Sequence, residues 1–342
     1  MTDTKGGSSR GGSLALSVLD LVPIGAGSSG PEAMRNSVQL ARAADQLGYQ
    51  RYWLAEHHGM PSIASSSPEI LIGHMASATR RIRVGSGGVM LQNHVPLKAA
   101  EAFHTLEALH PGRIDLGIGR APGTDPRTSQ ALRPFDPARF SEQLAEMIGL
   151  SSGSLPSQHP FHGVRVIPSD VDLPPIWILG SSGASARLAG ELGTGYSFAS
   201  HFSHTPATPA FEVYRQSFRP SPQFPEPHTI LGVAVICADT DEEAEYLATS
   251  TELMWVRISR NEFLPVPSPE EASSYPYTDR ERAIAARYRS LAIVGSPTTV
   301  RSRIDRLAAE SGAVEVMITS MMHSHAARLR SYHLLAKEYG LE

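Results

Sequence analysis

The sequence predicts an α/β protein of the (β/α)8 barrel class, and the alternation of its segments is the first observation that leads there. Short runs rich in β-branched and aromatic residues are each followed by an amphipathic stretch, and strands that alternate with helices form parallel sheets. The second observation is that eight such pairs follow one another within 342 residues. Eight pairs favour a closed TIM barrel over an open doubly wound sheet, although length alone would also allow two domains.

The expected strands are short and apolar, as buried parallel strands are. They span residues 14–20, 51–55, 81–89, 113–119, 175–180, 195–200, 229–237 and 313–319. Helix signals follow each of them. In the first helix, Pro31 suits the opening turn and Gly48 suits the end. In the helix before the last strand, Ser296 is the expected cap and Pro297 the first residue.

Three stretches interrupt this regular pattern. Residues 120–138 read as a loop rich in proline and arginine, and residues 151–174 read as an irregular excursion. Residues 261–290 contain four prolines and many charges. Because they follow the seventh strand, we expect them to form an insertion that serves as a lid. We expect residues 1–12 to form a flexible Gly/Ser-rich tail and residues 13–342 to form a single barrel domain.

The composition is that of an ordinary globular protein, with 41% hydrophobic residues and a formal charge of -4. No basic run indicates a nucleic-acid partner. No stretch approaches the roughly 18 apolar residues of a membrane span. The one cysteine, Cys237, ends the apolar run TILGVAVIC, so no intrachain disulfide forms and a buried thiol is expected. These features suit the cytoplasm.

Titratable side chains follow the second strand, where RYWLA ends in Glu56, His57 and His58. The active site of a (β/α)8 barrel lies at the C-terminal ends of its strands. Side chains alternate along a strand, so only part of this trio points into the barrel. Histidine suits proton transfer, although a pair of hydrogen-bonded rim histidines would explain the pattern equally well. A metal site built with His201 or His323 would need a chelating motif that is absent, and we expect none.

The run LGIGRAPG at residues 116–123 looks like a dinucleotide motif, but its spacing is GxGxxxG. Pro122 also prevents the immediate helix that such a motif requires. A Rossmann site is therefore rejected. Arg120, at the end of the fourth strand, is either a surface ion-pair partner or a ligand for an anion.

The run ILGSSGASARLAGELG places a strand end directly before a helix N-terminus. Exposed N–H groups and hydroxyls there form an anion site, although serine capping alone would also explain the pattern. The residues concerned are Gly180, Ser181, Ser182, Gly183 and Ser185. After the third strand, Gly87 and Gly88 leave bare backbone at the rim. They form either a bulge or a place where a flat ring approaches the main chain.

Taken together, these motifs resemble the bacterial luciferase-like flavin monooxygenases over nearly the whole chain. The matching stretches are YWLAEHHGMP, RIRVGSGGVMLQNHVPLKAAEAFHTLEALHPGRIDLGIGRAPG and ILGSSGASARLAGELGTGYSFASHF, in the family's order and spacing. The chain looks closer to the single-chain oxygenases of biosynthesis than to the light-emitting subunits. The resemblance implies a two-component system in a (β/α)8 barrel, in which FMN reduced by a separate NAD(P)H-dependent reductase reacts with O2. A C4a-peroxyflavin then oxygenates a small organic substrate such as an aldehyde or an aromatic polyketide.

The resemblance also implies roles for individual residues. His57 matches the histidine beside the flavin that assists proton transfer, and Glu56 and His58 match neighbouring positions. Gly87 and Gly88 match a non-prolyl cis peptide beneath the flavin ring. The expected phosphate ligands are Arg120, Arg139, Ser181, Ser182 and Ser185; the expected ring neighbours are Met90 and Asn93; and the expected substrate pocket contains Tyr196, Ser200 and His201.

One departure is Gly119, which stands where the light-emitting α subunit has a reactive cysteine, so no thiol chemistry is expected. A second is the stretch 261–290, which matches nothing in the family and leaves the substrate open. The same barrel superfamily includes F420-dependent oxidoreductases and non-catalytic flavin-binding chains, which remain alternatives. The resemblance further implies a homodimer.

Overall fold

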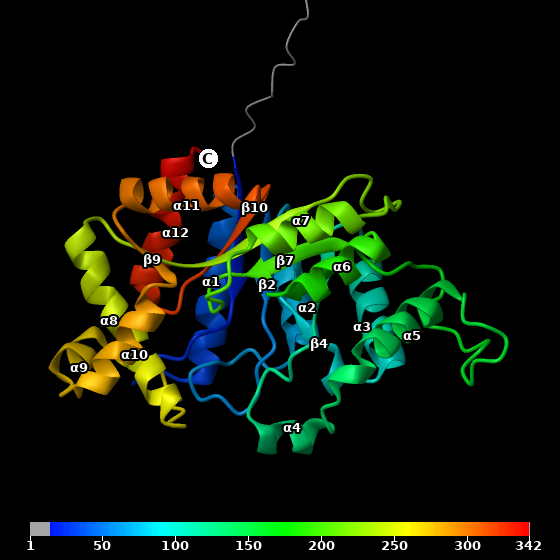
Figure 1. Ribbon diagram of the computed structural model, residues 1–342, viewed down its shortest axis with the longest axis horizontal. Coiled ribbons are helices and arrows are strands. Elements are labelled where there is room, and N and C mark those ends of the chain that lie inside the picture. The colour runs from blue at the N-terminus through cyan, green and yellow to red at the C-terminus, as the bar shows by residue number, and fades with distance from the viewer. Residues whose placement is uncertain (1–13, 342) are drawn as a thin grey trace, which may run out of the picture.

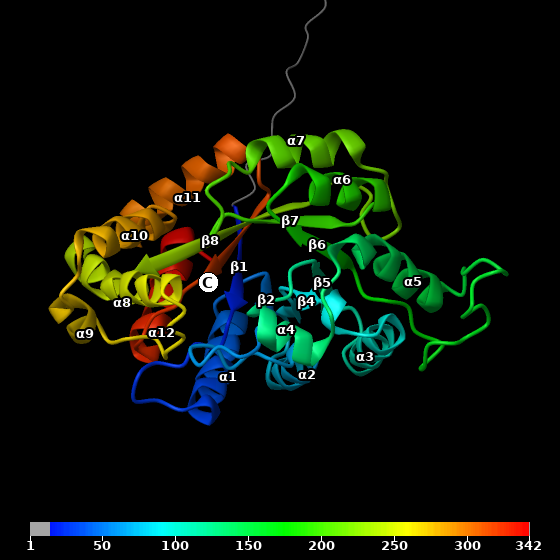
Figure 2. The same ribbon diagram turned by 60° about the horizontal axis from the view of Figure 1, so that its bottom comes forward.

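The computed structural model describes residues 14–341, so the expected tail at residues 1–12 lies outside the described residues (Figures 1 and 2). Eight parallel strands form a ring in the order β10-β1-β2-β3-β5-β6-β7-β8. Pairing of β10 with β8 closes this ring, as in Val316 against Leu231. The predicted barrel is confirmed.

The strands agree with the expected ones to within a few residues. They are β1 (Ala15–Asp20), β2 (Arg51–Leu54), β3 (Arg83–Ser86), β4 (Val89–Met90), β5 (Ile114–Gly119), β6 (Ile176–Gly180), β7 (Gly195–Ala199), β8 (Thr229–Cys237), β9 (Ala292–Gly295) and β10 (Glu315–Thr319). Two of them differ from the expectation. The expected strand 81–89 is divided into β3 and β4 by a cis peptide between Gly87 and Gly88. β9 was not expected, and it extends the sheet beyond the ring by pairing with β8.

The helices surround the strands, and α8, α9 and α10 lie together on one side of the molecule (Figure 2). They are α1 (Gly30–Gln46), α2 (Pro68–Ala78), η1 (Leu91–Asn93), α3 (Pro96–Leu109), α4 (Pro126–Leu132), η2 (Pro137–Arg139), α5 (Phe140–Ser152), α6 (Gly183–Leu192), α7 (Thr208–Ser217), α8 (Asp241–Ser259), α9 (Pro269–Ser274), α10 (Asp279–Arg289), α11 (Pro297–Ser311) and α12 (His325–Tyr339). No helix within residues 14–341 is long and apolar enough to cross a membrane.

Short helices occupy two stretches that were expected to be irregular. α4 interrupts the loop 120–138, and Asp125 caps it by accepting hydrogen bonds from the backbone N–H groups of Arg127 and Thr128. α9 and α10 occupy much of residues 261–290. Thr278 and Glu281 form a capping box at the start of α10. An Asp or Thr directly before a helix is a typical N-cap and predicts a helix start. The nearby prolines made these stretches look irregular instead.

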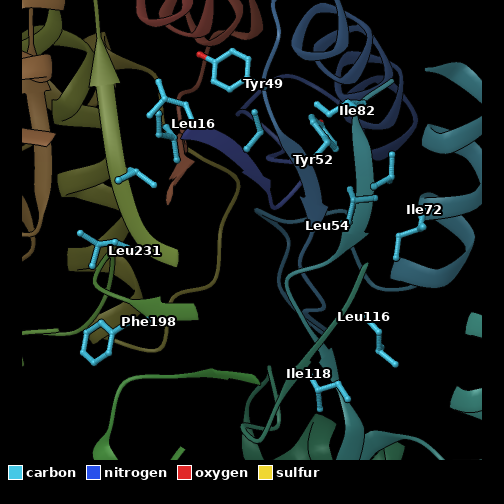
Figure 3. Close-up of a cluster of buried hydrophobic side chains, with 14 of the residues drawn as sticks. Leu16, Tyr49, Tyr52, Leu54, Ile72, Ile82, Leu116, Ile118, Phe198 and Leu231 are labelled. Atoms are coloured by element: carbon cyan, nitrogen blue, oxygen red, sulfur yellow. The ribbon is translucent and has the colours of Figure 1, made fainter. Parts of the chain in front are cut away.

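The main core lies between the outer face of the barrel and the helices. Leu54 on β2, Leu116 on β5 and Ile72 on α2 are fully buried members of this cluster (Figure 3). A second, smaller cluster fills the inside of the barrel, where Trp53 and Trp177 meet edge to face with ring centroids 5.5 Å apart. The barrel is therefore packed through its middle, and we look for a ligand site at the C-terminal ends of its strands, where such barrels carry their active sites.

Candidate active site

Small residues line the inside of the barrel at its C-terminal end. Alternation along β2 places Ala55 on the same inner face as Trp53, and alternation along β8 places Gly232 on the same face as Ile230. Gly87 comes directly after β3, and Gly119 is the last residue of β5. The side chains of Trp53 and Trp177 fill the inside of the barrel beneath these residues. We call the C-terminal end of the barrel interior, above the two tryptophans, the bowl.

Glu56 is fully buried, yet four groups from two segments of the chain converge on its carboxylate. One oxygen accepts hydrogen bonds from His58 Nε2 and Asn93 Nδ2, and the other accepts them from Met90 N and His94 Nε2, all at 2.8–2.9 Å. Burial alone would raise the pKa of Glu56, but the hydrogen bonds from His58, His94 and Asn93 outweigh it and lower the pKa to about 2. Glu56 therefore fastens the loop after β2 to the segment after β4.

His94, which was not singled out in the sequence, belongs to this cluster. Burial opposes its protonation, but the hydrogen bond that His94 donates to Glu56 and the negative charge of Glu56 outweigh burial and raise the pKa of His94. Asn93 also donates to the carbonyl of Pro122 at 3.1 Å. Glu56, His58 and Asn93 thus position the rim, and a place for Asn93 beside a flavin ring stays a prediction.

His57 points the other way from Glu56, as alternation along β2 requires. Its Nδ1 lies 3.1 Å from the carbonyl oxygen of Gly123. A carbonyl only accepts, so Nδ1 carries the proton of the neutral ring and Nε2 is the acceptor. Burial lowers the pKa of His57, which keeps the ring neutral at pH 7. The three titratable residues after β2 therefore have different surroundings: Glu56 and His58 hold the loop, and His57 faces the bowl.

His201, after β7, approaches the bowl from the opposite wall. Its ring occupies the room left by Gly232, where an added Cβ would lie 3.0 Å from His201 Nδ1. That nitrogen is buried and has no hydrogen-bond partner among the described residues. Burial lowers the pKa of His201 to about 4, and the nearby His57 lowers it further in the same direction. Two neutral imidazoles thus share the mouth of the barrel.

The backbone at Gly87 and Gly88 leaves no room for side chains. A Cβ on Gly87 would lie 2.6 Å from Leu19 Cδ1, and one on Gly88 would lie 2.8 Å from the carbonyl oxygen of Gly117. The half-buried Met90 side chain lies over Gly119. The cis peptide expected at Gly87 and Gly88 is present. Both glycines are buried, and their close packing against Leu19 and Gly117 explains why neither position carries a side chain.

The N-terminus of α6 is exposed and lacks a side-chain cap, because the hydroxyl of Ser182 makes no capping hydrogen bond. Ser185 Oγ instead donates to the carbonyl of Ser182 at 2.9 Å. Arg120 is exposed and forms no ion pair with another described side chain, whereas Arg139 forms an exposed pair with Glu142 at 3.6 Å. Free N–H groups at a helix start attract anions.

Tyr196 is the predicted pocket residue whose position differs from the expectation. Its side chain is fully buried and packs against Phe211 and Tyr214 of α7. Its hydroxyl lies 3.2 Å from both the carbonyl of Ser182 and Ser185 Oγ. Tyr196 therefore supports the start of α6 from behind and does not line the bowl. Side chains alternate along β7, so the sequence alone could have indicated that Tyr196 points outward.

Sequence reasoning missed Thr319 at the end of β10. Its side chain is 5% exposed, and its hydroxyl has no hydrogen-bond partner among the described residues. The run AVEVMIT held the signal, because Glu315, Met317 and Thr319 share one face. Residues 14–341 contain no group of three or more His, Cys, Asp or Glu arranged to hold a metal ion.

With this geometry in hand, comparison with known proteins decides the family. The family model described as luciferase-like monooxygenase matches residues 15–315. The chain belongs to the luciferase-like monooxygenase family. YvbT of Bacillus subtilis (strain 168), an uncharacterized protein, is 46% identical over 94% of this chain and 95% of its own. A luciferase-like monooxygenase of Escherichia coli (strain K12) is 41% identical over 94% of this chain and 96% of its own. The structure of apo-MsnO8 superposes with a TM-score of 0.86 at 37% identity, covering 96% of this chain and 98% of that one.

Relatives within the luciferase-like monooxygenase family carry names that specify different reactions. The N-acetyl-S-alkylcysteine monooxygenase of Bacillus subtilis (strain 168) is 35% identical over 94% of this chain and 97% of its own. Two more distant structures share the fold: the oxygenating constituent of 3,6-diketocamphane monooxygenase in complex with FMN, at 20% identity and TM-score 0.69, and an F420-dependent secondary alcohol dehydrogenase, at 13% and 0.68. They cover 95% and 96% of this chain, and 97% and 99% of their own. By its family, this chain is accordingly a luciferase-like monooxygenase.

Proposed function

We propose that this monooxygenase binds reduced FMN at the C-terminal end of the barrel and uses O2 to insert one oxygen atom into a small organic substrate. The carrying observation is the set of features at this end of the barrel: the glycine pair Gly87 and Gly88, the neutral imidazole of His57, and the uncapped start of α6. Bound reduced flavin would supply the electrons that activate O2. The residues present fit such a group.

In this proposal the phosphate of FMN is held by the backbone of Gly180 and Gly183, by Ser181, Ser182 and Ser185, and by Arg120. Ser182 is free to bind because it forms no cap, and Tyr196 keeps the loop in place. Arg139 also reaches this ligand if it leaves Glu142, which costs little because exposed ion pairs contribute about 0–1 kcal/mol.

The flat ring of FMN would lie against the main chain of Gly87 and Gly88, with Met90 at its edge. His57 Nε2 accepts a proton beside the ring, since Gly123 holds the proton on Nδ1. Because burial disfavours the charged ring, His57 returns that proton readily. The half-buried Ser200 and His201 form the facing wall, where the substrate enters.

Residues 261–290 serve as the lid in this proposal. Val266 exchanges backbone hydrogen bonds of 2.8 Å with Ile24 and Ala26 in the loop after β1. Arg287 on α10 donates to His204 in the loop after β7 at 3.2 Å. The segment thus contacts loops of two different strands at the mouth, where it would exclude water from the reaction.

Two partners complete the proposal. A separate NAD(P)H-dependent flavin reductase would supply reduced FMN. A second copy of the chain would cover α2 and α3, where Ile70 of α2, Leu109 of α3 and Val95, directly before α3, are 69%, 67% and 57% exposed. Light scattering coupled to size exclusion measures the mass and tests the dimer; a monomer at micromolar concentration would contradict it.

The phosphate site is tested by comparing FMN with riboflavin, which lacks the phosphate. We expect the wild type to bind FMN more tightly, as measured by quenching of flavin fluorescence. Arg120→Ala should weaken FMN binding about tenfold, in line with a charge-assisted hydrogen bond, and leave riboflavin binding unchanged. Arg127→Ala, an exposed arginine on α4, is the matched control. Equal affinity for both flavins, or preferential binding of F420, would contradict the proposal.

The role of His57 is tested by His57→Ala. We expect FMN affinity to remain within about twofold, because the phosphate and ring contacts persist. We expect product formed per O2 consumed to fall by a factor of about 10 or more, since positioned acid–base groups contribute about 10²–10⁴-fold. Oxygen uptake and peroxide release, measured together, give this ratio. An unchanged ratio would show that His57 does not handle the proton.

A further inference from the structure

One buried hydroxyl at the mouth of the barrel has no role in the site described so far. Thr319 is the last residue of β10 and pairs with Leu19 of β1 and with Ala234 of β8. Leu19 belongs to the cluster inside the barrel. Residues paired across parallel strands point to the same face. The side chain of Thr319 therefore faces the inside of the barrel at its open end.

Burial of the Thr319 hydroxyl lowers the stability of the folded protein. It is buried and has no partner among the described residues. Threonine in helices and strands ordinarily satisfies its hydroxyl on nearby carbonyls, as Thr79 and Thr229 do in this chain. An unsatisfied buried hydroxyl costs roughly 1–3 kcal/mol. Valine would fit the same strand position without that cost, so the hydroxyl requires an explanation.

The surroundings of Thr319 indicate what would satisfy it. Leu21, Leu179, Ala199 and Ala234 are half-buried apolar residues at the upper end of the barrel. The second polar atom there without a described partner is His201 Nδ1, which lies across Gly232 of β8. The groups assigned above to FMN lie at the ends of β2, β3, β5 and β6 and at the start of α6. Thr319 ends β10, which lies between β1 and β8 in the ring and carries none of those groups.

We propose that Thr319 determines specificity by donating a hydrogen bond to a carbonyl or amide oxygen of the substrate, whose apolar body rests on the surrounding aliphatic side chains. This inference rests on the proposed function, because it assumes that the substrate enters beside bound FMN. It names the substrate class as an apolar molecule that carries an oxygen acceptor. Thr319 positions this oxygen and takes no part in the transfer of electrons or protons.

The test compares two probes that differ in one group. Acetophenone carries a carbonyl oxygen where α-methylstyrene carries a methylene of similar size. Both are titrated calorimetrically into the protein loaded with oxidised FMN, so that no turnover occurs. We expect the wild type to bind acetophenone more tightly than α-methylstyrene. Thr319→Val should weaken acetophenone binding about fivefold to tenfold, which corresponds to one hydrogen bond, and should leave α-methylstyrene within about twofold.

Ser320→Ala is the matched control. Ser320 is the next residue, its hydroxyl is also buried without a described partner, and alternation directs it to the other face. It should leave the affinities of both probes unchanged. Thermal unfolding of both variants verifies that each is folded.

Three outcomes would overturn the inference. The wild type could bind both probes equally or bind neither, which contradicts the substrate class. Thr319→Val could weaken FMN binding itself, which would assign the hydroxyl to the flavin. Ser320→Ala could have the same effect as Thr319→Val, which would indicate a general disturbance of the strand end. FMN affinity and the reaction of reduced FMN with O2, measured on the same variants, show separately whether the proposed function stands.

Discussion

The two ends of the barrel use the same kinds of side chain in opposite ways. At the N-terminal end, Arg51 lies 2.8 Å from Asp115 and 3.0 Å from Glu315, and Arg83 lies 2.7 Å from Asp115. His228 and Ser17 complete the shell around Glu315. At the C-terminal end, His201 and Thr319 keep polar atoms without described partners. The charged groups of the closed end are paired by the protein alone, although Trp177 Nε1 beside them also lacks a described partner. We propose that a ligand completes the open end.

The buried charges at the N-terminal end of the barrel are held in their ionised forms. Burial alone would raise the pKa of Asp115 and Glu315, but the neighbouring Arg51 outweighs it and lowers both. The charges are thus retained and mutually fixed. Above the two tryptophans, the inside of the barrel contains small residues and polar atoms without described partners in place of paired charges. Glu56 stands between these extremes, since it is fully satisfied yet holds the loop that carries His57.

The largest expected effect is at the closed end. Arg51→Met leaves Asp115 and Glu315 buried without their shared cation, and breaking a buried pair costs about 3–5 kcal/mol. We therefore expect the free energy of unfolding, measured in urea, to fall by that amount. FMN affinity should be retained in the folded fraction. Arg301→Met, which removes exposed pairs with Asp305 and Glu338, is the control and should cost less than about 1 kcal/mol. Equal effects would remove the contrast between the ends.

An intermediate effect is expected at the junction. Glu56→Gln keeps the shape but replaces one acceptor oxygen with a donor that faces existing donors. We expect a loss of about 2 kcal/mol of unfolding free energy, together with less product per O2 because the loop bearing His57 loosens. Glu310→Gln, in an exposed pair with Arg306, should change neither quantity. If Glu56→Gln retained both, the carboxylate would not be the fastening point.

Much of this arrangement was predictable from the sequence, because local patterns carry it. Alternation and strand count gave the barrel, and the run AEHH placed His57 at the rim. The network around Glu56 was not predictable, since His94 and Asn93 approach it from a loop whose course depends on tertiary packing. The directions of the Tyr196 and Thr319 side chains followed from strand alternation that was not applied to them. The third strand that pairs with β8, which is β9, depended on a tertiary contact that no local pattern indicates.

The smallest expected effect is a pH dependence that distinguishes two histidines. His201 has a pKa of about 4 in the fold and an ordinary value near 6.5 when unfolded. Between these values the unfolded chain binds the extra proton, so stability contributed by this site falls as pH falls, by at most about 1.4 kcal/mol per pH unit. His94, whose pKa is raised, contributes with the opposite sign, and its contribution is lost as pH rises above 6.5.

Urea unfolding of His201→Gln and His94→Gln across pH 4.5 to 8 measures both signs. We expect His201→Gln to flatten the loss of stability on the acid side, and His94→Gln to flatten the loss on the basic side. The same slope in both variants would contradict the distinction between an unsatisfied and a satisfied imidazole.

In the proposed function, the open end of the barrel binds reduced FMN and controls its reaction with O2. Rapid mixing of the protein and anaerobically reduced FMN with oxygenated buffer, followed by absorbance, tests this claim most directly. We predict that oxidised FMN returns much more slowly than it does from free reduced FMN, and that His57→Ala shortens this delay. Return of oxidised FMN at the rate seen without protein would contradict the account.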